Sequence, residues 1–309
     1  MRFKPSEALR FLGGLAVAAF ALGFVVLRVT SCAPAPGPGP VPAFVVPRPA
    51  PPPAAPTASC DTGPATAAHA NTASLQTLAW APFGRAEIGW QTYAPLVARE
   101  IHTSCKPDTP GFAAALAAWE GGQRLPADGT MTAAVFSRMK GVIETRRPFV
   151  RLTALHICPP APDPSALAQA APSEGYAGKA IQLLPGALAA YRRMVAAARA
   201  DDAAIAADPR DLTIFSGFRS PAADAARCVS EHNCSGVVRA TCSAHRTGLA
   251  MDVYVGQAPG FGPDSSADPN RLFMSRTPTY RWLVANADRF GFAPYPFEPW
   301  HWEWTGEAP

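Results

Sequence analysis

The stretch SAHRTGLAMDVYV, residues 243–255, combines a strand pattern with two side chains that do not suit an apolar strand. From Leu249 onward every second residue is apolar, and this period of two predicts a half-buried strand. Asp252 then points away from the apolar face. Gly248 permits a tight turn before the strand, which brings His245 back toward the same side as Asp252. The two side chains predict a metal site, a catalytic pair or a buried hydrogen bond.

The residues around this stretch predict a domain of the α+β type. The expected elements are two further strands at residues 212–220 and 299–306 and two helices at residues 178–206 and 277–292. Pro185 suits the first turn of the first helix. Thr277 can cap the second helix, and Gly291 suits its end. Helices mixed with a small antiparallel sheet follow, preceded by a helical region at residues 60–170.

The N-terminus has the charge and hydropathy of an export segment. Residues 1–31 carry a net charge of +3, which leaves +1 for the remaining chain and no basic face for nucleic acid. Residues 11–27 lack charged side chains and form an apolar run. The following VTSC, ending at Cys32, resembles a bacterial lipobox, from which Arg28 departs. Within residues 1–32, a signal anchor and a lipoprotein signal both remain open, and both place the chain on the periplasmic side of a bacterial membrane.

A proline-rich segment follows the export segment. Residues 33–57 contain 11 prolines in 25 positions, a composition that favours extended polyproline II structure. We expect this segment to be a linker between the membrane and the domains that follow.

The cysteines fit an exported protein. The chain contains seven, of which six follow Cys32. Six cysteines outside the cytoplasm predict three disulfides, and the sequence does not choose among the possible pairings. Because no C-x-x-C pair occurs, a zinc ribbon is disfavoured.

Part of the helical region has a recognisable pattern. Residues 108–142 predict one helix with Phe112, Leu116 and Trp119 on one face, then an ADG turn and a second helix. This pattern resembles the small helical peptidoglycan-binding module. Two packed helices without a ligand explain it equally well.

The last predicted strand supplies further polar residues. In EPWHWEW the tryptophans alternate with His301 and Glu303, so that the tryptophans can share one face. Two imidazoles and one carboxylate, from His245, Asp252 and His301, are a usual ligand set for catalytic zinc. Glu298 is then a candidate base for the attacking water, since Pro299 excludes a helical zinc motif at this place.

Three segments together resemble the zinc D-alanyl-D-alanine carboxypeptidase family, which includes the vancomycin-resistance-type enzymes. SGFRS, SAHRTGLAMD and EPWHWEW occur here in the order of that family's motifs, within residues 175–309. The resemblance implies that His245, Asp252 and His301 bind Zn²⁺.

The same resemblance assigns roles to three further residues. It implies that Glu298 is the base, that Arg219 stabilises the oxyanion and that Ser243 lies near the substrate. Relatives often have an apolar or basic residue and a tyrosine where this chain has Trp302-Glu303-Trp304, which affects the expected substrate pocket.

We therefore expect a zinc peptidase that acts on peptidoglycan stem peptides, as a D-alanyl-D-alanine carboxypeptidase. An endopeptidase with the same zinc chemistry, and a cell-wall-binding protein with a non-catalytic peptidase-like domain, are the alternatives. The sequence predicts a membrane contact through its N-terminal segment and gives no indication of oligomeric state.

Overall fold

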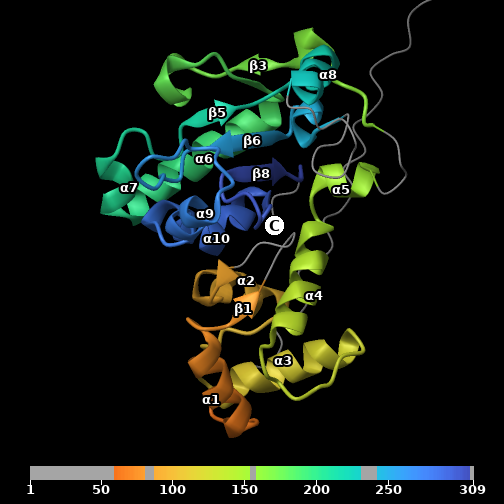
Figure 1. Cartoon of the computed structure of the whole chain (residues 1–309), viewed down its shortest axis with the longest axis vertical. Coiled ribbons are helices and arrows are strands. Elements are labelled where there is room, and N and C mark those ends of the chain that lie inside the picture. Colours follow the sequence, from red (N-terminus) through yellow and green to blue (C-terminus); the bar gives the residue numbers. More distant parts are fainter. Residues whose placement is uncertain (1–58, 81–86, 154–157, 231–241, 307–309) are drawn as a thin grey trace, which may run out of the picture. The chain divides into compact units, whose positions relative to one another are not determined.

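A four-stranded antiparallel sheet carries the predicted strand of residues 248–255 at its centre (Figure 1). The computed structural model describes residues 59–80, 87–153, 158–230 and 242–306. The strands of this sheet, in spatial order, are β5 Ile214–Ser216, β6 Ala250–Val253, β8 His301–Trp304 and β7 Phe292–Pro294. The fold is α+β, as the sequence predicted.

The remaining elements surround this sheet or precede it in the chain. Short strands form two further antiparallel pairs, β1 Ala79–Trp80 with β2 Glu87–Ile88 and β3 Ala168–Gln169 with β4 Gln182–Leu183. The α-helices are α1 Ala65–Ser74, α2 Ala94–Glu100, α3 Pro110–Gly122, α4 Ala133–Glu144, α5 Pro148–Thr153, α6 Pro185–Asp201, α7 Ala203–Ala207, α8 Pro221–Ser230, α9 Asp268–Met274 and α10 Pro278–Asn286. None of the helices in these described ranges is long and apolar enough to cross a membrane.

Strand β6 is buried on both faces, so the prediction of a half-buried strand was wrong in this respect. Met251 and Val253 are fully buried and belong to the main hydrophobic core. On the other face, Asp252 is only 6% exposed. The Tyr176 ring stacks on Tyr254 just beyond the strand, with ring centroids 5.2 Å apart. The alternation of apolar residues therefore distinguished the two faces of β6, but it did not show that polar partners cover the face of Asp252.

The capping residues act as the sequence predicted. Pro185 is the first residue of α6, and the Thr277 hydroxyl accepts a hydrogen bond from the Tyr280 backbone N–H at the start of α10. The predicted helix of residues 277–292 ends earlier as an α-helix and continues as a 3₁₀ turn, and Phe292 begins strand β7. So short a strand has no separate signal in the sequence.

Helices α3 and α4 confirm the predicted helix pair within residues 108–142. Thr109 and Thr132 cap them, and the loop between them turns at Gly129, whose φ is +77°. The buried Glu120 carboxylate accepts a hydrogen bond of 2.8 Å from the Gly129 N–H. The buried Asn71 amide bonds the same loop from α1. These polar groups lock the loop internally.

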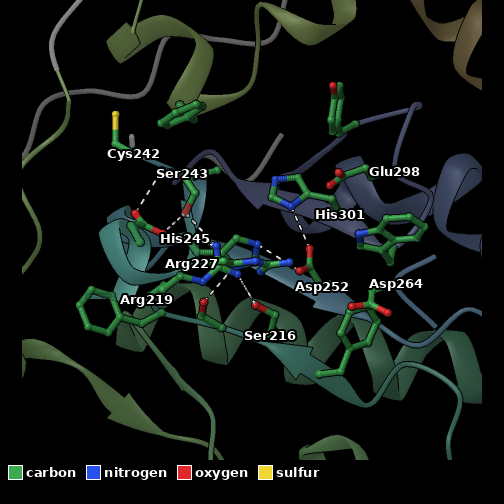
Figure 2. A pocket seen from close by; sticks show the side chains of 18 of the residues that line it. Ser216, Arg219, Arg227, Cys242, Ser243, His245, Asp252, Asp264, Glu298 and His301 are labelled. Atoms are coloured by element: carbon green, nitrogen blue, oxygen red, sulfur yellow. Dashed lines mark hydrogen bonds and ion pairs between the residues drawn. The ribbon is translucent and has the colours of Figure 1, made fainter. Parts of the chain in front are cut away.

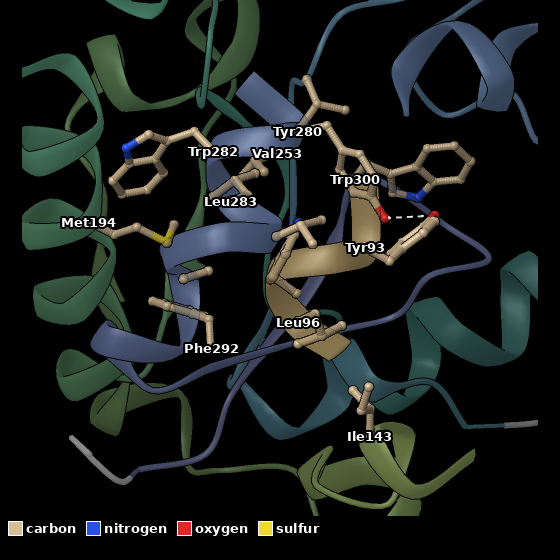
Figure 3. Packing of buried hydrophobic residues seen from close by; sticks show 14 of the residues in the cluster. Tyr93, Leu96, Ile143, Met194, Val253, Tyr280, Trp282, Leu283, Phe292 and Trp300 are labelled. Atoms are coloured by element: carbon tan, nitrogen blue, oxygen red, sulfur yellow. Dashed lines mark hydrogen bonds between the residues drawn. The ribbon is translucent and has the colours of Figure 1, made fainter. Parts of the chain in front are cut away.

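The upstream helices pack directly on the helices of the C-terminal part. One hydrophobic cluster includes Leu96 and Ile143 together with Leu283 and Phe292 (Figure 3). The Tyr280 hydroxyl lies 3.2 Å from the Tyr93 hydroxyl within it. The described residues thus belong to a single compact unit. The division into domains at 60–170 and 175–309 stays a prediction.

Two disulfides join described cysteines, Cys60 to Cys105 and Cys158 to Cys242. Cys228 is disulfide-bonded as well. The predicted export segment and linker, residues 1–32 and 33–57, lie outside the described residues.

Candidate metal centre and active site

Three elements bring the predicted ligands together. His245 lies in the 3₁₀ turn Ala244–Thr247, and Gly248 ends this turn with a φ of +70°, as a left-handed residue. The turn leads directly into β6, which carries Asp252. His301 begins β8 and pairs with Asp252 across the two strands. Register and turn together therefore place the three side chains at one point of the sheet.

The three side chains converge on one another (Figure 2). The His245 Nε2 atom lies 3.2 Å from Asp252 Oδ2, and the His301 Nδ1 atom lies 2.9 Å from Asp252 Oδ1. One ligand atom from each residue lies within 4.8 Å of the others. All three side chains are buried.

The second nitrogen of each imidazole ring has a partner of its own. His245 Nδ1 lies 2.8 Å from the Gly217 carbonyl oxygen, and because a carbonyl only accepts, Nδ1 carries the proton. His301 Nε2 lies 3.3 Å from the Glu303 carboxylate. These partners orient the rings so that Nε2 of His245 and Nδ1 of His301 face the common point at Asp252.

The electrostatics of this cluster are those of a charged buried network. Burial alone would raise the pKa of the Asp252 carboxyl, but the charges and hydrogen bonds of His245 and His301 hold it well below its ordinary range. Burial alone would lower the pKa of His301, but its hydrogen bonds to Asp252 and Glu303 raise it to about 9. The carboxylates thus favour positive charge at this place.

The donor set fits a divalent cation. Two imidazole nitrogens and one carboxylate oxygen suit zinc, which accepts both donor types in three-ligand catalytic sites. Gly217 and Glu303 each contact the outer nitrogen of one ring, which leaves one donor atom of each ring directed at Asp252. A cation there would replace protons as the positive charge between the rings and the carboxylate.

Glu298 lies in the turn between β7 and β8. The turn is closed by a backbone hydrogen bond of 2.8 Å from the His301 N–H to the Glu298 carbonyl. The Glu298 side chain is half-buried and lines the same cavity as the ligands (Figure 2). Burial is the main cause that raises the pKa of this carboxyl, and the charge of Asp252 adds to it.

Arg219 and Ser243 form a second polar group in the cavity. The Arg219 guanidinium donates to the Ser243 hydroxyl at 3.2 Å and to the Ser216 hydroxyl at 3.1 Å. Ser243 in turn donates to Asp224 at 2.8 Å, and Asp224 also contacts Arg219 at 3.4 Å. The guanidinium is therefore fixed in orientation, as an oxyanion donor needs to be.

The cavity has a volume of about 610 Å³, within the usual range of ligand sites. Its wall includes residues that the sequence did not indicate, above all Asp224 and Arg147. Asp224 follows Arg219 by five residues, in the first turn of α8, and an acidic residue at that spacing was the available signal. Arg147 had no local signal, because its partner Glu303 is 156 residues away.

One family model matches the part of the chain that contains these residues. Residues 180–307 match the family model described as VanY, D-alanyl-D-alanine carboxypeptidase. The solved structure of the LdcB LD-carboxypeptidase, described as revealing the molecular basis of peptidoglycan recognition, is similar over 47% of this chain and 70% of that chain, at 23% identity and a TM-score of 0.32. The comparison with curated proteins found no match.

The matched segment contains the three candidate ligands together with Glu298, Arg219 and Ser243. The family match therefore falls on the part of the chain in which His245, Asp252 and His301 converge. The family comparison thus supports a VanY-type D-alanyl-D-alanine carboxypeptidase domain over residues 180–307.

Proposed function

We propose that this chain is an exported zinc peptidase that removes the terminal D-alanine from peptidoglycan stem peptides. The observation that carries the proposal is the convergence of His245, Asp252 and His301 in a cavity that Glu298 also lines. The match of residues 180–307 to the VanY family model supports peptidase chemistry, and the description of that family names D-alanyl-D-alanine as the substrate.

His245, Asp252 and His301 would hold the zinc ion through Nε2, a carboxylate oxygen and Nδ1. When bound, zinc supplies Lewis acidity that polarises a peptide carbonyl and acidifies an attacking water. The chain's own contribution is to fix the donor atoms in advance, through Gly217 and Glu303 behind the two rings.

Glu298 is the proposed general base. It takes a proton from the attacking water and returns it to the amine of the leaving D-alanine. Burial moves its pKa upward, which makes the carboxylate a stronger base for the proton of the attacking water. Pro299 restricts the backbone of Glu298 and stiffens its link to His301.

Arg219 is the proposed donor to the oxyanion of the cleaved carbonyl. Its guanidinium is already held by Ser216, Ser243 and Asp224, so that little reorganisation is needed during the reaction. Ser243 lies at the cavity wall, in contact with Arg219, where it can meet the substrate.

The proposed location is the periplasmic side of a bacterial membrane, with an N-terminal anchor or a lipid on Cys32. The apolar run of residues 11–27 and the linker of residues 33–57 support it. Disulfides are typical of oxidising compartments, and the described cysteines are bonded.

The test uses the full-length chain, purified in detergent and loaded with zinc. Incubation with a pentapeptide ending in D-Ala-D-Ala should release one D-alanine, as measured by mass spectrometry. Glu298→Gln should keep the bound zinc and lower turnover by about 10²–10⁴-fold, because the amide cannot accept the proton. Glu174→Gln is the matched control, since Glu174 pairs with Arg192 outside the cavity, and it should act at the parental rate.

Two results would change the proposal. Cleavage inside a longer or cross-linked stem peptide, without release of terminal D-alanine, would assign an endopeptidase. Zinc binding without cleavage of either substrate would assign a non-catalytic wall-binding protein.

A further inference from the structure

A second glutamate lies directly behind the proposed ligand His301. Glu303 is two residues further along β8, on the same side of the strand, and is 1% exposed. Its Oε1 atom lies 3.3 Å from Nε2 of His301, the ring nitrogen that faces away from Asp252. The carboxylate thus contacts the imidazole without facing the ligand side of the ring.

The Glu303 carboxylate accepts two hydrogen bonds from the upstream part of the chain. The Arg147 Nε–H donates to Oε1 at 2.7 Å, and the Phe149 backbone N–H donates to Oε2 at 2.9 Å. Arg147 follows helix α4, and Phe149 belongs to α5. Buried and occupied in this way, Glu303 is unsuited to exchange protons with a water molecule, which separates its role from that of Glu298.

Arg147 is itself fixed in place. It is 7% exposed, and its guanidinium carbon lies 4.1 Å from the centroid of the Tyr295 ring. The Tyr295 ring meets the His301 ring edge-on at 6.0 Å, and the Tyr295 backbone N–H donates to the His301 carbonyl at 3.1 Å. Arg147, Glu303, Tyr295 and His301 are therefore four members of one contact network.

We infer that Glu303 and Arg147 form a positioning pair that holds His301 in the orientation and tautomer needed for a metal ligand, so that the helices upstream of residue 175 complete the metal centre. The inference rests on the zinc site of the proposed function. A carboxylate behind a ligating histidine fixes the proton on the outer nitrogen and raises the basicity of the inner one. Arg147 fixes the carboxylate, and it links the α4–α5 junction to β8.

The readout is zinc affinity of the full-length chain, measured by competition with a chromophoric chelator at fixed pH. Glu303→Gln should bind zinc about 10–100-fold more weakly, as is usual when an outer partner of a metal ligand is lost. Arg147→Met should weaken binding in the same direction. The double variant should bind zinc no more weakly than the weaker-binding of the two single variants, because both substitutions disable the same positioning pair.

A matched pair controls for the loss of an ion pair as such. Arg192 and Glu174 make a two-point contact at 2.7 and 2.8 Å, outside the cavity. Glu174→Gln and Arg192→Met should leave zinc affinity unchanged. Circular dichroism checks that each variant is folded at the assay temperature. Should Arg147→Met fail to fold, Arg147→Lys keeps the charge without the planar fork and should give an intermediate zinc affinity.

The outcomes separate the inference from the proposed function. A parental chain that binds no zinc would reject the proposed metal site, and the inference with it. Stoichiometric zinc binding by the parental chain, with unchanged affinity in folded Glu303→Gln, would reject the positioning pair and leave the proposed function standing. A cobalt-loaded sample gives a second signature, since a reoriented His301 should shift the visible absorption of Co²⁺ in Glu303→Gln but not in Glu174→Gln.

Discussion

The ion pair between Glu87 and Arg271 should make the stability of this protein depend on pH. Glu87 is 3% exposed, and its Oε1 atom lies 3.2 Å from Arg271 Nη1. Its Oε2 atom has no hydrogen-bond partner among the described residues. Arg271 is fully buried and also pairs with Asp268 at 2.7 Å. The carboxylate is thus strongly desolvated and only partly compensated.

The magnitude follows from the pKa of Glu87. Burial raises it from 4.5 to about 7, although the charge of Arg271 acts in the opposite direction. The folded protein therefore holds this proton more tightly than the unfolded chain does. Stability from this group is fully present below about pH 4.5 and is lost as the pH rises through about 7. The rise of the pKa from 4.5 in the unfolded chain to about 7 in the folded protein corresponds to a change of about 3.4 kcal/mol in stability, at 1.36 kcal/mol for each pKa unit.

The perturbation is Glu87→Gln, which keeps the shape and removes the titration. Urea unfolding of the full-length chain and the variant between pH 4 and 8 gives the difference in unfolding free energy at each pH. We expect the free energy of unfolding of the variant, relative to that of the parent, to increase by about 3 kcal/mol as the pH rises across this window. Titration of the metal ligands occurs in both proteins and cancels in the difference. Parallel pH profiles for the two proteins would refute the reasoning. Glu174→Gln should run parallel to the parent in the upper part of this window, because the hydrogen bond to half-exposed Arg192 lowers the pKa of Glu174 and its titration lies at the acid end.

Three further predictions concern the site, the helical region and the cysteines. Arg219→Lys should lower turnover of the D-Ala-D-Ala pentapeptide by roughly 10²-fold, less than Glu298→Gln does, because an ammonium cannot reproduce the planar fork between two hydroxyls; an unchanged rate would remove Arg219 from the mechanism. Gly129→Ala should lower the free energy of unfolding by about 2 kcal/mol or more, since its φ is +77° and a Cβ would lie 2.3 Å from the Ala113 carbonyl oxygen; urea titration measures it. Thiol labelling of denatured, unreduced protein should find no free thiol beyond Cys32, and several labelled cysteines would reject the disulfide framework.

The convergence of His245, Asp252 and His301 could be predicted because its signals are local. Period two from Leu249 to Val255 assigned Asp252 to the face opposite the core, and Gly248 marked the turn that returns His245 to it. His301 followed in the same way from its alternation with tryptophans. Each inference needed fewer than ten neighbouring residues, and the structure brings all three side chains together.

The surroundings of these residues could not be predicted, because they depend on contacts between distant segments. Nothing near Arg147 indicates that Glu303 is its partner, and nothing near Glu303 indicates that the upstream helices cover it. The same reason explains the burial of both faces of β6, which alternation alone described as half-exposed. Strand β7 was missed because three residues are too few for a periodic pattern.

The register of the sheet and the candidate metal centre support each other. Asp252 pairs with His301, and Met251 pairs with Trp302, so that adjacent positions of β6 serve opposite faces. A slip of one residue would turn the Asp252 carboxylate into the apolar core and Met251 toward the cavity. Burying a carboxylate among the apolar side chains of this core costs several kcal/mol. The alternation that first indicated a strand therefore also disfavours the neighbouring registers, which is why strands only four residues long can hold the His245, Asp252 and His301 cluster in place.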